Sequence, residues 1–256
     1  MQTTIHEDPK DIWDTLEGTL GGVLEGGRGL NGYERSMTLK REGETLVKVF
    51  YGGYNGWPNV LASGAATDDV APVVRGAWPV HEVTRMDSAQ DFDSAGGYDT
   101  VRAALVGIHE QSGISKREIE STVNGIRSRT IYLGSPSSRV QARLYEKGMF
   151  EHQLGNGEAP ENWFRLEVQV RPTGDARSRA AEVNPAEAWG FSPWTRELAA
   201  VVLGLNVDRV NMQLKREPDY MRAVAALRRQ YTATMQKALE VEGSWEAVGK
   251  LLGVVL

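Results

Sequence analysis

Cysteine is absent from this sequence of 256 residues, which excludes disulfide bonds and thiolate zinc sites. No apolar run approaches the roughly 18 residues that a membrane-spanning helix needs, and the N-terminus lacks the basic start and apolar core of a secretory signal. The glycine-rich segment 21–32 lacks the Gly-Lys-Ser/Thr ending of a P-loop, which predicts a turn-rich connector. We therefore expect a cytoplasmic protein with no membrane partner.

The composition is that of a globular protein, but its charge is unevenly distributed. Hydrophobic residues make up 41% of the chain and charged residues 25%, as is ordinary for a protein that buries a core. The formal net charge of −5 argues mildly against nucleic-acid binding. Segment 127–148, however, holds five basic residues and one acid, Glu146. A local basic face on an acidic protein can still hold DNA.

The hydrophobic periodicity predicts mostly strands in the first two thirds of the chain and helices in the last third. The expected strands are 33–40, 45–51, a short one at 60–64, 80–92, 128–133, 140–147 and 163–171, with helices at 9–24 and 98–111. After Pro172 the pattern is helical and includes a long helix at 217–242. We expect an α+β protein with two parts. The first is residues 1–172, with a sheet core at about 33–172, and the second is a helical C-terminal extension at 173–256.

The strand 140–147 carries Arg143, Tyr145 and Lys147 at a spacing of two, so these side chains are expected to share one face. A tyrosine between two cations is a candidate nucleophile for a phosphodiester, because the cations can hold the phosphate and favour the phenolate. A half-buried strand with a solvated polar face explains the same alternation.

Carboxylates occupy two strands that otherwise favour apolar residues. Asp87 and Asp91 fall on one face of the strand 80–92, and Glu167 falls on the polar face of the strand 163–171. Carboxylates that converge on one sheet face can bind Mg²⁺ or Mn²⁺, which would polarise a phosphate. The alternative is that Asp87 and Glu167 form cross-strand ion pairs with arginines, namely Arg85, Arg143 or Arg165.

A polar turn precedes the tyrosine strand. Ser135 and Ser137 offer hydroxyls and backbone amides that could hold a phosphate, although a solvated turn explains them equally well. With Arg139 and Arg165 they form the expected DNA-binding set.

Four stretches in order resemble the replication initiation factor (Rep_trans) family of rolling-circle initiators and relaxases. They are Val83-Thr-Arg-Met-Asp-Ser-Ala-Gln-Asp-Phe92, Thr130-Ile-Tyr-Leu-Gly-Ser-Pro-Ser-Ser138, Arg143-Leu-Tyr-Glu-Lys-Gly148 and Trp163-Phe-Arg-Leu-Glu-Val-Gln-Val-Arg171. The resemblance spans about residues 33–171. It implies a central antiparallel sheet, with helices packed on the face opposite the site.

The resemblance also implies a DNA nicking and joining enzyme, with residues 1–172 as the catalytic domain. Tyr145 would attack a phosphate and form a 5′-phosphotyrosyl link, leaving a free 3′-hydroxyl. Asp87 and Glu167 would hold the divalent metal, Mg²⁺ or Mn²⁺, with Asp91 as a further ligand. Lys147, Arg143 and Arg165 would neutralise the phosphate. The rival nucleophile is Tyr132, which we expect to be structural.

The expected substrate is single-stranded or extruded origin DNA, because the target strand must be exposed. A host helicase and a second copy of the chain are further candidate partners, and a bacterial host cell is the expected setting. Two alternatives remain open: a sequence-specific DNA-binding protein without nicking activity, and a metal-dependent phosphodiester hydrolase in which Tyr145 plays no part.

Overall fold

The computed structural model describes residues 1–54, 56–210, 231 and 234–253, and it divides the chain into two compact units, Met1–Gln213 and Leu214–Leu256. The second unit contains helical residues 234–242 and the helix α8 (Trp245–Leu251), which fits the expected C-terminal helical segment. Most of the long helix expected at 217–242 lies outside the described residues. In the described part of the chain, no helix has the length and apolar content to cross a bilayer.

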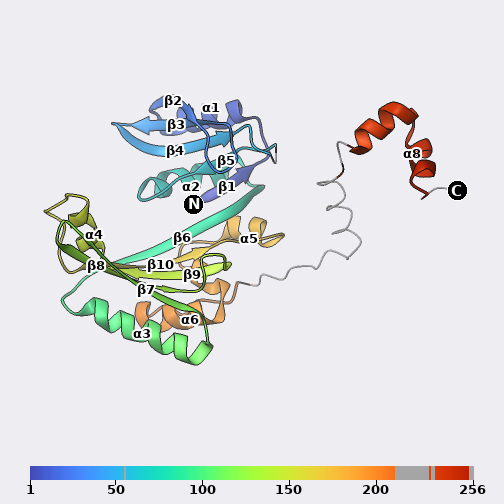
Figure 1. Cartoon of the computed structure of the whole chain (residues 1–256). Helices are drawn as coiled ribbons and strands as arrows, with labels where there is room; N and C mark the ends of the chain where they lie inside the picture. The colour runs from blue at the N-terminus through green and yellow to red at the C-terminus, as the bar shows by residue number, and fades with distance from the viewer. Residues whose placement is uncertain (55, 211–230, 232–233, 254–256) are drawn as a thin grey trace. The chain divides into compact units, whose positions relative to one another are not determined.

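The first unit is built on one antiparallel sheet of ten strands in the order β2-β3-β4-β5-β1-β6-β10-β9-β8-β7 (Figure 1). The strands are β1 Gln2–Ile5, β2 Val23–Arg28, β3 Arg35–Arg41, β4 Glu44–Tyr51, β5 Asn59–Leu61, β6 His81–Asp93, β7 Lys116–Val123, β8 Ile126–Leu133, β9 Val140–Tyr145 and β10 Trp163–Val170. The helical segments are α1 Pro9–Leu20, α2 Ala66–Ala77, α3 Gly97–Ser112, α4 Lys147–Gln153, α5 Ala176–Glu182, η1 Glu187–Phe191, α6 Pro193–Leu198 and η2 Ala199–Leu203. The α+β fold expected from the sequence is thereby confirmed.

The two halves of the sheet have the same topology. The first half runs β1-α1-β2-β3-β4-β5-α2, and the second runs β6-α3-β7-β8-β9-β10-α5, with α4 inserted before β10. Counted outward from the centre, each half places its first strand innermost, followed by its fifth, fourth, third and second. The innermost strands, β1 and β6, pair antiparallel with each other. The fold is therefore a repeated unit, and only the second copy carries the residues expected at the site.

Each half has its own hydrophobic core between the sheet and its helices. In the first half, Ile12 and Leu16 of α1 and Val70 of α2 pack on sheet residues such as Val49. In the second half, α3, α5, η1 and α6 cover the sheet (Figure 1), and their core residues include Leu105, Trp189 and Leu198. The segments at 176–203, expected in a C-terminal extension, thus contribute to the core of the first unit. The domain boundary expected after residue 172 stays a prediction.

Three strands were not expected from the sequence. The segment 21–32, expected to be a connector, contains the strand β2, and the sheet begins at Gln2 rather than near residue 33. The strand β7 was also missed. β2 and β7 are the two edges of the sheet, and their residues are nearly all exposed. An exposed edge strand does not need apolar alternation, so the periodicity that identifies half-buried strands is absent from both.

Candidate active site

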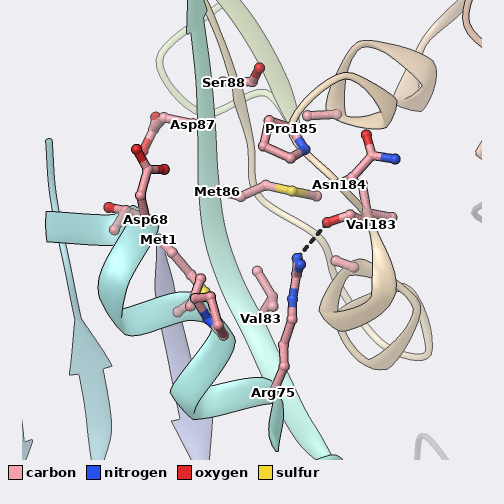
Figure 2. Close-up of a pocket in the computed structure, with 15 residues that line it drawn as sticks. Met1, Asp68, Arg75, Val83, Met86, Asp87, Ser88, Val183, Asn184 and Pro185 are labelled. Carbon is pink, nitrogen blue, oxygen red and sulfur yellow. Dashed lines mark hydrogen bonds between the residues drawn. The ribbon is translucent and has the colours of Figure 1, made fainter. Parts of the chain in front are cut away.

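A β-bulge in β6 decides which side chains reach the open face of the sheet. Thr3 of β1 pairs with Val83 but the preceding residue, Gln2, pairs with Arg85, so Thr84 is an extra residue in β6. An extra residue reverses the alternation of side chains that follow it. Val83 is accordingly buried in the core, whereas Arg85 and Asp87 point to the face away from the helices. Figure 2 shows Asp87 and Met86 leaving β6 on opposite sides.

The strands β6, β10 and β9 bring the expected residues together on that open face. Paired residues on neighbouring strands share a face and form rows across the sheet. The rows are Asp91–Arg165–Tyr145, Ala89–Glu167–Arg143 and Asp87–Gln169–Gln141. The expectation that Asp87 and Asp91 share a face with Glu167 and Tyr145 is therefore confirmed.

The face forms one wall of a cleft of about 670 Å³. Its other wall is the segment 61–65 after β5 and the first turn of α2, which supplies Asp68. Asp68 points toward Asp87 in Figure 2. The sequence analysis missed Asp68, because nothing in a polar first turn of a helix signals that it will face another strand.

Each of the three expected metal ligands is paired with an arginine. Asp87 Oδ2 lies 2.9 Å from Arg85 Nε, and Asp91 Oδ2 lies 2.6 Å from Arg165 Nη2. Glu167 Oε1 lies 2.7 Å from Arg143 Nη2. Gln169 Nε2 also donates to Asp87 Oδ1 at 2.7 Å. The alternative of ion pairs is thus present in the structure, and these three arginines and three carboxylates balance in charge.

The donor set does not fit a three-carboxylate metal centre as it stands. Asp87 and Asp91 are four residues apart on one strand, which separates them by about 13 Å, and Glu167 lies opposite Ala89 between them. Among the residues that the structure describes, no group of three acidic or histidine side chains is placed to hold a metal ion. The divalent metal stays a prediction.

The phenol of Tyr145 is harder to ionise than the sequence suggested. Arg143 lies 4.5 Å over its ring. Burial and the negative charge of Glu167 nevertheless raise the pKa of Tyr145 above its usual value, against the opposing effects of Arg165 and Arg143. Arg165 and Arg143 do favour the phenolate, as expected of neighbouring cations, but burial and the charge of Glu167 outweigh them in the free protein, where each of these arginines is paired with a carboxylate.

Lys147 does not share the strand face with Tyr145, which corrects the expected spacing. The strand β9 ends at Tyr145, and Lys147 begins the helix α4. Its ammonium group pairs with Glu151 and lies 5.3 Å over the ring of Trp163. Its charge still contributes to lowering the pKa of Asp91, although the hydrogen bonds from Arg165 are the main cause. Lys147 therefore borders the site rather than flanking the phenol.

The serine turn lies at the opposite end of β9 from Tyr145. Ser135, Ser137 and Arg139 precede Val140, and the five residue steps from there to Tyr145 span about 17 Å. Arg171 Nη1 fixes the turn by donating to the carbonyl of Pro136 at 2.9 Å. These residues do not line the cleft, so their contact with DNA stays a prediction.

Tyr132 lies on the same face as Tyr145 but one strand farther from the cleft. It pairs with Arg143 across β8 and β9, and Arg117 lies 4.6 Å over its ring. Tyr132 does not line the main cleft, whereas Tyr145 does. The geometry therefore favours Tyr145 over Tyr132 as a group that meets a ligand.

Comparison with known proteins finds a likeness to a solved structure. No protein-family model matches the sequence, and no curated protein matches it. Among solved structures, the chain is similar to the rolling circle replication initiator protein from Geobacillus stearothermophilus, with a TM-score of 0.53 and 19% identity over 82% of this chain and 97% of that chain. The two chains share a fold. At this identity the likeness establishes the architecture, which agrees with the resemblance seen in the sequence.

Proposed function

We propose that this protein is a rolling-circle replication initiator that nicks a specific DNA strand through Tyr145 and later rejoins it. The observation that carries the proposal is the row Asp91–Arg165–Tyr145 beside the row Ala89–Glu167–Arg143, on the wall of a cleft. The fold shared with a rolling circle initiator supports the same reading.

Arg143 and Arg165 are the groups that would hold the scissile phosphate. Both lie next to Tyr145 on the open face, and a guanidinium can donate two hydrogen bonds to a phosphate. A phosphate that draws Arg143 away from Glu167 leaves that carboxylate without its partner. DNA binding would thus break an ion pair of the free protein at the point where the reaction occurs.

In the proposed step, the Tyr145 oxygen attacks the phosphorus and the bond from phosphorus to the 3′-oxygen breaks. The phenolic proton passes to Glu167, the carboxylate whose negative charge contributes to the raised pKa of Tyr145. The leaving 3′-oxygen takes up a proton from water, so the products are a 5′-phosphotyrosyl link and a free 3′-hydroxyl. Because the phosphodiester energy is conserved in that link, rejoining needs no ATP.

The substrate that fits is single-stranded or extruded origin DNA, because an attacking phenol on a sheet face needs an exposed phosphate. A host helicase and a second copy of the chain stay predictions about partners. A nicking enzyme, a DNA-binding protein and a hydrolase could all use an arginine-rich cleft, so the experiment distinguishes these three functions.

The test uses a labelled pool of random-sequence single-stranded DNA, which contains cleavable sites whatever the origin sequence is. The protein is incubated with the pool, with Mn²⁺ or with EDTA, and run on a denaturing gel. We expect a protein-sized labelled band that is lost in Tyr145→Phe and kept in the matched variant Tyr132→Phe. Cleavage that survives Tyr145→Phe would favour the hydrolase. Binding with neither cleavage nor adduct would favour the DNA-binding protein.

A further inference from the structure

Two aromatic side chains lie just beyond Tyr145, outside the set expected from the sequence. Phe150 of α4 is 43% exposed, and its ring is edge-on to that of Tyr145, with 6.4 Å between centroids. Trp163 begins β10 on the same face as Arg165 and is half-buried. We call Phe150, Trp163 and Lys147 the aromatic platform.

The ammonium group of Lys147 lies near both rings of the aromatic platform. Its ammonium nitrogen lies 5.8 Å from the centre of the Phe150 ring and 5.3 Å from that of Trp163. A cation over an aromatic face is attracted to its π electrons. The platform therefore offers an apolar surface with a positive charge at its edge, next to the candidate nucleophile.

The exposed ring is fixed in place and is not a loose surface residue. The helix α4 is anchored by Gln153, which donates to the carbonyl of Ile126 at 2.9 Å and accepts from Ser128. His152 Nε2 lies 2.8 Å from the carbonyl oxygen of Ala159. Gly148 allows close packing, because a Cβ there would lie 1.8 Å from the carbonyl oxygen of Pro160. Phe150 therefore presents its exposed ring from an anchored helix.

We propose that Phe150 stacks on an unpaired base of the DNA strand whose phosphate is held beside Tyr145. The proposal rests on the proposed function, since the phosphate bound by Arg143 and Arg165 brings the adjacent base within reach of α4. Stacking on an aromatic side chain is tolerant of base identity, and it distinguishes a single strand from a duplex whose bases are already stacked. The platform thus selects exposed DNA at the site of cleavage.

The test compares two fluorescein-labelled 12-mers with equal numbers of phosphates: oligothymidylate, and a chain of abasic tetrahydrofuran sites. Fluorescence anisotropy gives the Kd of each. We expect the full protein to bind oligothymidylate about 5- to 100-fold more tightly, from stacking of one base. Phe150→Ala should remove most of this ratio, and Phe150→Tyr should keep it.

The control is Trp57→Ala, which removes an aromatic residue of similar exposure, 46%, from the loop between β4 and β5. This variant should keep the ratio of the unchanged protein. If both 12-mers bind equally, or if Phe150→Ala leaves the ratio intact, the proposed stacking on Phe150 is overturned. Tight binding of the 12-mers in that case leaves the proposed DNA function standing. Failure to bind either 12-mer overturns both. If circular dichroism shows that Phe150→Ala is unfolded, Phe150→Leu takes its place. The stacking proposal then requires that Phe150→Leu lose the ratio, and a ratio that it keeps overturns the proposal.

Discussion

The charge of Glu167 makes a quantitative prediction about Tyr145. Glu167→Gln removes a negative charge next to the phenol and keeps the shape of the side chain. Glu167 and Tyr145 are diagonal neighbours on β10 and β9, which places them about 7 Å apart. Two charges at that distance interact by about 0.6 kcal/mol in water and about 2.4 kcal/mol at an effective dielectric constant of 20. We therefore expect the pKa of Tyr145 to fall by about one unit in the variant.

The measurement is a titration of tyrosinate absorbance at 295 nm. Because the chain has eight tyrosines, the curve of Tyr145 is obtained by subtracting the Tyr145→Phe protein, in both the original and the Glu167→Gln background. The original protein should titrate above pH 10, since burial and Glu167 both favour the neutral phenol. The Glu167→Gln midpoint should lie lower, because loss of a nearby negative charge favours the phenolate.

The matched control is Asp87→Asn, which removes a carboxylate of the same cleft that is not among the main causes of the raised pKa of Tyr145. Its midpoint should equal that of the original protein within error. A Glu167→Gln midpoint that is unchanged or higher would refute the electrostatic account of the site. An equal shift in Asp87→Asn would show that the effect belongs to the whole cleft and not to Glu167.

One deletion and three substitutions test the fold that positions the site. Deletion of Thr84 removes the bulge and turns Asp87 and Asp91 toward the core, so we expect loss of the cooperative thermal transition, whereas Thr84→Ala should keep it. Gly148→Ala places a Cβ against the Pro160 carbonyl and should lower the free energy of unfolding in urea by about 2 kcal/mol or more. Gly107→Ala, at an open position in α3, should raise it by about 0.5–1 kcal/mol, and the opposite order of these two variants would contradict the packing described for α4.

The sequence predicted the site face well because alternation in a strand is a local property. Asp87 and Asp91, and likewise Arg143 and Tyr145, are fixed on a common face by spacing alone once they lie in one strand. Lys147 does not share this face because β9 ends at Tyr145, two residues before it. The residue at which a strand ends depends on the elements that pack against it. Periodicity could not locate the end.

The sequence named Arg85, Arg143 and Arg165 as candidate partners of the carboxylates, but it could not say which arginine pairs with which carboxylate. Nothing in the spacing of Glu167 says that it lies opposite Arg143, because register depends on the order of strands in the sheet. The bulge at Thr84 and the edge strands β2 and β7 were missed for the same reason. Their position in the sheet determines their exposure, and exposure determines whether alternation is needed.

The central claim is that Tyr145 is the residue that becomes joined to DNA. The most direct test is mass spectrometry of the protein after incubation with single-stranded DNA, nuclease treatment and digestion with trypsin. The account predicts nucleotide mass on the peptide 144–147, which contains Tyr145. Nucleotide mass on the peptide 130–139, which contains Tyr132, or on any other peptide would contradict it.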